Sequence, residues 1–445
     1  MEVFIKIAQF LLSLSLLIIL HEFGHFIAAR IFKTRVEKFY LFFDAWGKKL
    51  FSLKKGDTEY GIGWLPLGGY VKISGMIDES MDKEQMKLPP KPYEFRSKPA
   101  WQRLIIMLGG VTVNFILGIL IYIMIAFVWG EDYVRPDDVK NGFTVADTFK
   151  EFGFKEGDKI LKIDGEVPFN VLDINKNLFL KNIKTITVAH QNGTTETINL
   201  PEGVGKTMWN EGVLFPFNPR FYAVIDTVIP KSPAAEAGIK KGDHIIEVNN
   251  NPVTYWNEFT KRVDSTTTSV TVIRDNDTLK LAITPEIIDK KSKRLQIGVG
   301  PNTDSAYDEQ HKKYSFIQSI SRGNSMGLDK LQGYIGQFKY LFTKKGAGEI
   351  GGFISIGKIF PSKWSWQSFW SITAFLSIML GFMNLLPIPA LDGGHALFVL
   401  FEMITGRKPS DKFLEYAQIT GFVLLMGLLL LANGNDIYKL IKGWL

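Results

Sequence analysis

The sequence of 445 residues predicts a polytopic α-helical membrane protein with four transmembrane helices and β-rich domains inserted between the second and the third. Two observations lead to this fold class. Strongly apolar stretches occur at residues 4–32, 104–128, 368–386 and 416–432, and a helix needs about 20 apolar residues to span a bilayer. The region at about 131–310 is polar by contrast and has the composition of soluble structure.

The apolar stretches and the breaks between them divide the chain into eight segments. In chain order these are a first transmembrane helix at 1–33, a loop at 34–103, a second transmembrane helix at 104–130, β-rich domains at 140–201 and 221–286, an amphipathic helix at 314–342, a third transmembrane helix running into a Leu-Asp-Gly-Gly motif at 366–395, and a fourth transmembrane helix at 414–433. The amphipathic helix is predicted from apolar residues at helical spacing, and it lies either on the membrane surface or against the β-rich domains.

Loop charge predicts the orientation in the membrane. The loop from Lys33 to Arg103 carries 14 Lys and Arg residues, whereas only Lys6 precedes the first helix. Because positively charged loops stay in the cytoplasm, we expect both termini and the β-rich domains outside the cytoplasm, as in a bacterial inner-membrane protein. The net charge of +7 comes with no basic cluster typical of nucleic-acid binding, and the absence of cysteine excludes disulfides and thiolate metal sites.

The first transmembrane helix contains the sequence His21-Glu22-Phe23-Gly24-His25. On a helix this spacing puts two imidazoles one turn apart on one face, where both can bind one zinc ion with the glutamate beside its water. Ionisable residues inside a span are costly and usually functional. The pattern therefore predicts hydrolytic metal chemistry within the bilayer. Three further histidines lie in the polar region and are expected to be exposed or locally hydrogen-bonded: His190, His244 and His311.

A catalytic zinc usually takes three protein ligands and one water, so a third ligand is required. Pro387 and Pro389 must break the end of the third apolar stretch, and non-helical backbone at membrane depth is tolerated only where protein or water surrounds it. Asp392 follows directly and is the predicted third ligand. His395 and Glu402 are the alternatives.

The second β-rich domain resembles a bacterial, circularly permuted PDZ domain. Residues 225–253 follow the order strand, short helix, turn, strand and turn, with Ser232-Pro233 before the helix and Gly242-Asp243 in the turn. A weaker likeness occurs at 154–168 in the first domain, which lacks the Ser-Pro segment. The resemblance implies two PDZ domains.

The His-Glu-x-x-His motif at 21–25, the Asn-x-x-Pro-x-Pro-x-x-Asp-Gly motif at 384–393 and the PDZ-like insert together resemble the site-2 protease family, the M50-type intramembrane zinc metalloproteases. The resemblance covers nearly the whole chain and is strongest to its bacterial members. It implies one zinc ion per chain, a catalytic base, and a side chain that holds the substrate or its reacting carbonyl. The residues that match these roles are His21, His25 and Asp392 as ligands, Glu22 as base, and Asn384 as the substrate-holding residue.

Residues 61–72 match a membrane-associated β-hairpin of the same family. Alternating small and bulky residues, Pro66 and paired glycines independently predict strand, turn and strand. The resemblance implies that Gly68, Gly69 and Tyr70 contact an extended substrate strand. A plain cytoplasmic hairpin is the alternative.

The second span departs slightly from the family pattern. Val111 stands where the family usually has a proline, and Asn114 remains after it. We expect Asn114 to bond to a neighbouring helix rather than to the metal.

The family resemblance implies an intramembrane zinc metalloendopeptidase that cleaves single-span membrane proteins in regulated intramembrane proteolysis. An upstream site-1 protease would first shorten the substrate outside the membrane, and anti-sigma-factor-like proteins or remnant signal peptides are the expected substrates. The PDZ pair could bind peptides by strand addition, exclude bulky substrates, or act as a spacer. The alternative function is a non-proteolytic PDZ scaffold in the membrane with a structural zinc.

Overall fold

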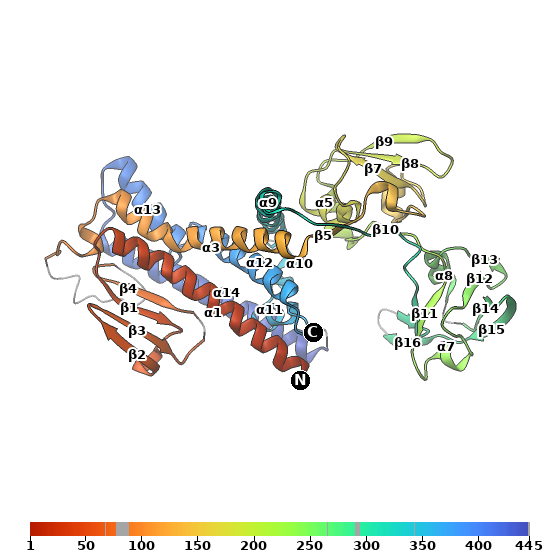
Figure 1. Cartoon of the computed structure of the whole chain (residues 1–445), viewed down its shortest axis with the longest axis horizontal. Helices are drawn as coiled ribbons and strands as arrows, with labels where there is room; N and C mark the ends of the chain where they lie inside the picture. Colours follow the sequence, from red (N-terminus) through yellow and green to blue (C-terminus); the bar gives the residue numbers. More distant parts are fainter. Residues whose placement is uncertain (67, 77–88, 265, 290–293, 342, 444–445) are drawn as a thin grey trace. The chain divides into compact units, whose positions relative to one another are not determined.

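The chain folds into two units in a computed structural model, which describes residues 1–66, 68–76, 89–264, 266–289, 294–341 and 343–443 (Figure 1). The helical unit comprises Met1–Gly130 and Lys313–Leu445, and the inserted unit comprises Glu131–Lys312. The predicted class, a helical membrane protein with a β-rich insertion after the second span, is confirmed.

Long helices dominate the helical unit. Its helices are α1 (Glu2–Ile31), α3 (Ala100–Trp129), α9 (Phe316–Leu341), α10 (Lys344–Glu349), α11 (Phe353–Ile359), α12 (Trp366–Leu385), α13 (Asp392–Thr405) and α14 (Asp411–Ile441). Helix α3 packs against α1, α9, α12 and α13. Within the described residues, α1, α3, α12 and α14 are the helices long and apolar enough to cross a membrane.

The predicted third span is two helices with a break between them. The Ser365 hydroxyl caps α12 by accepting a hydrogen bond from the Ser368 amide at 3.2 Å, and α12 ends at Leu385, just before the prolines of the break. Residues 386–391 are not helical, and α13 begins at Asp392. The break therefore turns the chain so that a carboxylate opens the next helix.

Gly393 and Gly394 allow the break to fold tightly. A Cβ on Gly393 would lie within 2.5 Å of the Leu386 carbonyl oxygen, and one on Gly394 would lie 2.6 Å from the Ile388 carbonyl carbon. Only glycine fits so close to the preceding backbone.

The loop between α1 and α3 contains a four-stranded sheet. Its strands are β1 (Val36–Leu41), β2 (Lys49–Lys55), β3 (Thr58–Gly63) and β4 (Tyr70–Ile73), in the order β2-β3-β1-β4. The predicted hairpin across 61–72 is wrong in its pairing: β3 and β4 both form, but each pairs with β1, β3 in parallel and β4 antiparallel. Strand β1 carries the fully buried Val36 and Tyr40, so it occupies the central position and separates the two. Residues 77–88 of the predicted loop lie outside the described part.

The inserted unit has two hydrophobic cores. Its helices are α4 (Asp147–Lys150), α5 (Ile174–Leu180), α6 (Val204–Glu211), α7 (Pro233–Glu236) and α8 (Trp256–Arg262). The first core spans Val134 to Phe217 and the second spans Ala223 to Ile283. The first therefore extends beyond the predicted 140–201 segment at both ends.

Antiparallel strands surround these cores. A three-stranded sheet has the order β7-β8-β9 (Lys159–Ile163, Thr185–Ala189, Thr195–Asn199), and a four-stranded sheet has the order β13-β12-β14-β15 (Asn251–Pro252, His244–Val248, Thr268–Arg274, Asp277–Ile283). The remaining pairs are β5 (Glu131–Tyr133) with β19 (Gln310–Lys312), β6 (Phe143–Val145) with β10 (Phe217–Pro219), β11 (Ile225–Val228) with β18 (Val299–Pro301), and β16 (Glu286–Asp289) with β17 (Arg294–Gln296).

Helix α9 corresponds to the predicted amphipathic helix at 314–342, whose last residue lies outside the described part. It belongs to the helical unit and packs on α3 and α12. Gly323 lies against the Ile123 backbone of α3, while Phe316 and Ile317 are exposed. The close approach of α9 to α3 thus occurs at a small residue, while the large apolar side chains at the start of the helix are exposed.

Candidate metal centre

Helices α1 and α3 cross at paired glycines. A Cβ on Gly109 of α3 would lie 2.5 Å from the Gly24 carbonyl oxygen of α1, so any larger residue would push the helices apart. Small residues permit such close approach between membrane helices. The crossing brings α3 directly against the histidine-bearing face of α1.

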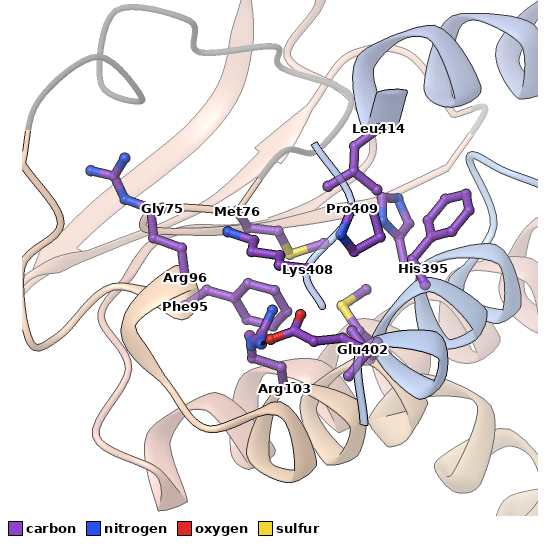
Figure 2. A pocket seen from close by; sticks show the side chains of 13 residues that line it. Gly75, Met76, Phe95, Arg96, Arg103, His395, Glu402, Lys408, Pro409 and Leu414 are labelled. Atoms are coloured by element: carbon purple, nitrogen blue, oxygen red, sulfur yellow. Dashed lines mark hydrogen bonds and ion pairs between the residues drawn. The ribbon is translucent and has the colours of Figure 1, made fainter. Parts of the chain in front are cut away.

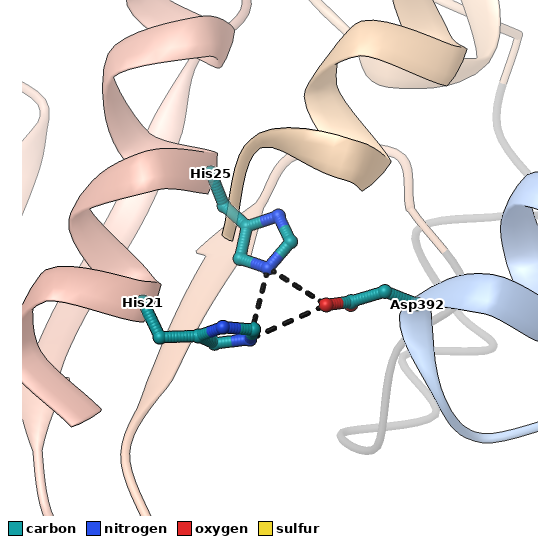
Figure 3. Close-up of side chains that lie close together, drawn as sticks. All are labelled: His21, His25 and Asp392. Atoms are coloured by element: carbon teal, nitrogen blue, oxygen red, sulfur yellow. Dashed lines mark hydrogen bonds and ion pairs between the residues drawn. The ribbon is translucent and has the colours of Figure 1, made fainter. Parts of the chain in front are cut away.

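Three potential metal-ligand atoms converge between α1 and the start of α13 (Figure 3). His21 Nε2 and His25 Nε2 lie 3.3 Å apart, and each lies 3.3 Å from Asp392 Oδ2. Both histidines are buried, and Asp392 Oδ2 is buried without a hydrogen-bond partner. Among the described residues, this is the one group of His, Cys, Asp or Glu side chains with metal-site spacing.

The spacing of these atoms fits a zinc ion. Two ligands bound at about 2.0 Å on neighbouring corners of a tetrahedron lie about 3.3 Å apart. Two imidazole nitrogens and one carboxylate oxygen are also donors that zinc takes. Three grouped ligands leave one tetrahedral corner for water or substrate, which is the arrangement of a catalytic rather than a structural site.

One face of α3 contacts the outer side of both imidazoles. The Ile106 carbonyl lies 2.8 Å from His25 Nδ1, and Asn114 Nδ2 lies 3.0 Å from His21 Nδ1. Between them, a Cβ on Gly110 would lie 2.6 Å from His21 Cε1 and would also overlap the His25 ring. The sequence interpretation placed Asn114 against a neighbouring helix but missed Ile106 and Gly110. Their spacing with Asn114 puts residues 106, 110 and 114 on one face of α3, but only the packing of α1 against that face gives them a role.

Glu22 faces the sheet as well as the ligand group. Its carboxylate lies close to both histidines, to Asp392 and to the Val71 backbone of β4. A Cβ on Gly69 would lie 3.5 Å from Glu22 Cγ. The acidic side chain thus lies between the ligand atoms and the edge strand β4.

Asn384 reaches the same place from the last turn of α12. Its Nδ2 lies 3.3 Å from His21 Nε2. Helix α1 and the segment from the end of α12 to the start of α13, which are far apart in the sequence, therefore bring a histidine pair, a carboxylate and an amide together.

The other predicted substrate-contact residues line the start of β4. The Tyr70 hydroxyl donates a hydrogen bond to Asp44 Oδ1 at 2.8 Å, and its ring stacks on Tyr40 at 5.5 Å between centroids. Burial and this hydrogen bond raise the pKa of Tyr70. Gly69 lies against Ile18 of α1, and Gly68 lies against the Phe43 ring. Tyr70 thus anchors the strand, while Gly69 lies against α1.

The alternative third ligands lie in a separate pocket (Figure 2). His395 and Glu402 line it together with Arg103 and Lys408. Glu402 Oε1 accepts a hydrogen bond from Arg103 Nη2 at 2.5 Å, and Arg103 is buried. The Glu402 carboxylate is therefore engaged by a cation of α3 and does not join the ligand group.

Comparisons with known proteins identify the family of the chain. The model of peptidase family M50 matches residues 9–428. A protein of Neisseria meningitidis, assigned by its name to the zinc metalloproteases, is 30% identical over 97% of this chain and 98% of its own. The regulator of sigma E protease of Haemophilus influenzae is 29% identical over 98% of this chain and 99% of its own. The regulator of sigma-E protease RseP of Escherichia coli is 29% identical over 98% of both chains.

Among solved structures, the HtrA3 PDZ domain bound to a phage-derived ligand matches 15% of this chain and 85% of its own, at 26% identity and a TM-score of 0.13. At that TM-score the likeness does not establish the PDZ fold, which stays a prediction for both β-rich domains.

Proposed function

The chain belongs to peptidase family M50 and is a membrane zinc metalloprotease; on this premise we propose that it cleaves single-span membrane proteins inside the bilayer with one zinc ion per chain. The observation that carries the proposal is the convergence of His21 Nε2, His25 Nε2 and Asp392 Oδ2 at mutual distances of 3.3 Å. The two histidines belong to α1, a candidate membrane span. Asp392 belongs to α13, which follows the candidate span α12.

In this proposal, His21, His25 and Asp392 hold the zinc. When bound, zinc supplies a Lewis acid that activates water and polarises a carbonyl group. The Glu22 carboxylate accepts the proton of the attacking water and passes it to the leaving amine, as a general base and then a general acid. The location of Glu22 beside all three ligands supports this role.

Asn384 and β4 would hold the substrate. The Asn384 amide is a hydrogen-bond donor close to the ligand group, so it can bond to a substrate carbonyl or support a developing oxyanion. Strand β4 lies at the end of its sheet, and Gly69, just before it, lies against α1. A substrate unwound into a strand could pair with this edge, which would extend it past Glu22.

We further propose the orientation that the loop charges predict. The sheet-bearing loop faces the cytoplasm, the inserted unit and both termini lie outside it, and the membrane is the bacterial inner membrane. The inserted unit is proposed to contain two PDZ domains. The two separate hydrophobic cores support this count.

The proposed substrates are anti-sigma-factor-like proteins and remnant signal peptides, and an upstream site-1 protease would shorten them first. The names of the Haemophilus and Escherichia relatives, regulators of sigma E, support the first class. The alternative of a non-proteolytic scaffold with a structural zinc is not favoured. A structural zinc takes four protein ligands, whereas the ligand group in the described residues has three.

The test uses purified full-length protein in detergent with a model single-span substrate. We expect Glu22→Gln to lower the cleavage rate about 10²–10⁴-fold, the contribution of a general base, while zinc content stays near that of wild type. Glu2→Gln, an exposed change on the same helix, is the matched control and should cleave normally. Equal cleavage by wild type and Glu22→Gln would remove Glu22 from the reaction.

A further inference from the structure

We propose that Asn114 is a positioning residue that selects the tautomer of His21 able to bind the metal. This inference rests on the proposed function and deepens it. It concerns the nitrogen of each ligand imidazole that faces away from the ligand group, because a neutral imidazole carries one proton and can bind a metal only through its other nitrogen.

The tautomer of His25 follows from a backbone contact. Its Nδ1 lies 2.8 Å from the Ile106 carbonyl oxygen, which can only accept a hydrogen bond. The His25 proton therefore resides on Nδ1. The lone pair of Nε2 is left to point at the group formed with His21 and Asp392.

His21 has an amide in the equivalent position. Its Nδ1 lies 3.0 Å from Asn114 Nδ2, while Asn114 Oδ1 is buried without a hydrogen-bond partner. With the nitrogen facing the ring, the amide donates to Nδ1, so the proton of a neutral ring must sit on Nε2 and would occupy the metal-binding position. A half-turn of the amide about its Cβ–Cγ bond exchanges oxygen and nitrogen in place. Oδ1 then accepts the proton of Nδ1, and Nε2 becomes free to bind.

Asn114 is held firmly enough to act in this way. It is fully buried, and its backbone carbonyl accepts a hydrogen bond from the Ser377 hydroxyl of α12 at 2.7 Å. It thus lies where α1, α3 and α12 meet, one turn along α3 from Gly110. We infer that in the metal-loaded enzyme the Asn114 carbonyl and the Ile106 carbonyl serve the two histidines in the same manner, as acceptors behind the ligands.

The experiment measures zinc affinity of the full-length protein by competition with a chromophoric chelator. Asn114→Leu keeps the approximate volume but removes the acceptor, and we expect it to weaken zinc binding about 10–100-fold. Asn114→Asp can only accept when ionised, and it should hold zinc at least as well as wild type. Ser377→Ala is the matched control, because it removes a buried hydroxyl at the same helix crossing without touching His21, and it should leave the affinity unchanged.

A purely structural role predicts a different pattern. If Asn114→Asp weakens zinc binding as much as Asn114→Leu, or if Asn114→Leu binds zinc as wild type does, the proposal is overturned. The absorption spectrum of the cobalt-substituted enzyme is a second readout: Asn114→Asp should keep the wild-type tetrahedral bands. Should Asn114→Leu fail to fold, Asn114→Ala takes its place in the same comparison.

These outcomes separate the inference from the proposed function. A wild-type chain that binds no zinc would overturn both. A wild-type chain that binds zinc and cleaves substrate, with Asn114 variants of unchanged affinity, would overturn only the role of Asn114.

Discussion

Two buried histidine sites, one in each unit, use similar residues in different ways. In the helical unit, His21 and His25 meet Asp392. In the inserted unit, His190 Nδ1 lies 2.7 Å from Asp158 Oδ1, and its Nε2 lies 2.9 Å from Glu196 Oε2. Both sites place buried imidazoles against carboxylates. Only the arrangement of the ring nitrogens separates them.

Each ring nitrogen of His190 lies within hydrogen-bond distance of a different carboxylate. Asp158 and Glu196 accept hydrogen bonds from the ring, which stabilises its protonated form and raises the pKa of His190. In the helical unit, both Nε2 atoms point instead to one place, and both Nδ1 atoms face α3. Convergence of two Nε2 atoms on one place, rather than the presence of a nearby acid, therefore distinguishes a metal site from an ion pair.

The largest expected effect comes from removing one histidine of each site. His25→Ala should reduce zinc from about one per chain to near zero and abolish cleavage, because two ligands do not complete a catalytic site. His190→Ala should keep the zinc of wild type. Elemental analysis of the purified variants measures this difference. Zinc loss in both variants would contradict the distinction between the two sites.

A pair of carboxylates sharpens the comparison within the helical unit. Asp392→Asn should lose most of its zinc, since a neutral amide is a weak zinc ligand. Glu402→Gln should keep its zinc but lower the free energy of unfolding by about 1–3 kcal/mol, because it leaves the buried Arg103 without its charged partner. Thermal unfolding and zinc content of both variants test this. If Glu402→Gln lost its zinc and Asp392→Asn kept it, the third ligand would be Glu402 and not Asp392.

The glycine behind the histidines should give a smaller effect. A methyl group on Gly110 would overlap the His25 ring, so Gly110→Ala should displace the ligands and weaken zinc binding about 10–100-fold. Gly427→Ala, in α14, is the control, since nothing lies within 4 Å of its added Cβ. Chelator competition compares the two variants. Similar zinc affinities would show that the ligands do not depend on the close approach of α3.

The smallest effect concerns the pH dependence of the inserted unit. Because the folded pKa of His190 is raised, its contribution to stability is complete below the unfolded pKa of about 6.5 and is lost as the pH rises through the folded pKa. Unfolding of this unit in the full-length protein, followed by hydrogen exchange, should therefore show greater stability at acidic than at alkaline pH. The expected difference is on the order of 1 kcal/mol, since Glu196 is half exposed.

The variant His190→Gln isolates the contribution of His190 to the pH dependence of stability. It should remove most of the pH-dependent difference, because glutamine does not titrate. An unchanged pH dependence in the variant would assign the effect to other groups.

The sequence predicted the parts of the metal site that carry a chemical signature. The spacing of His21 and His25 in an apolar helix, and Asp392 after a proline-broken helix, were sufficient to nominate the three residues that the structure brings together. His190 was expected to be exposed or locally hydrogen-bonded, and the structure shows the second of these alternatives. Gly110 and the Ile106 carbonyl could not be nominated in the same way, because a glycine and a backbone group acquire a role only from the helix that packs against them.

Strand pairing in the loop between α1 and α3 follows from long-range contacts rather than from local sequence. Alternation of small and bulky residues indicates that β3 and β4 are strands, but it does not say which strand lies between them. The parallel pairing of β1 with β3 depends on the chain returning across the sheet, which no turn motif at 61–72 specifies. Segments with local signals were therefore predicted well, and the contacts between them less well.

The central claim is that one zinc ion binds between α1 and α13, and zinc K-edge X-ray absorption of the unmutated, full-length protein tests it most directly. We expect a first shell of nitrogen and oxygen atoms at about 2.0–2.2 Å, with the outer-shell scattering of two imidazole rings. A zinc environment with one imidazole or none would contradict the account.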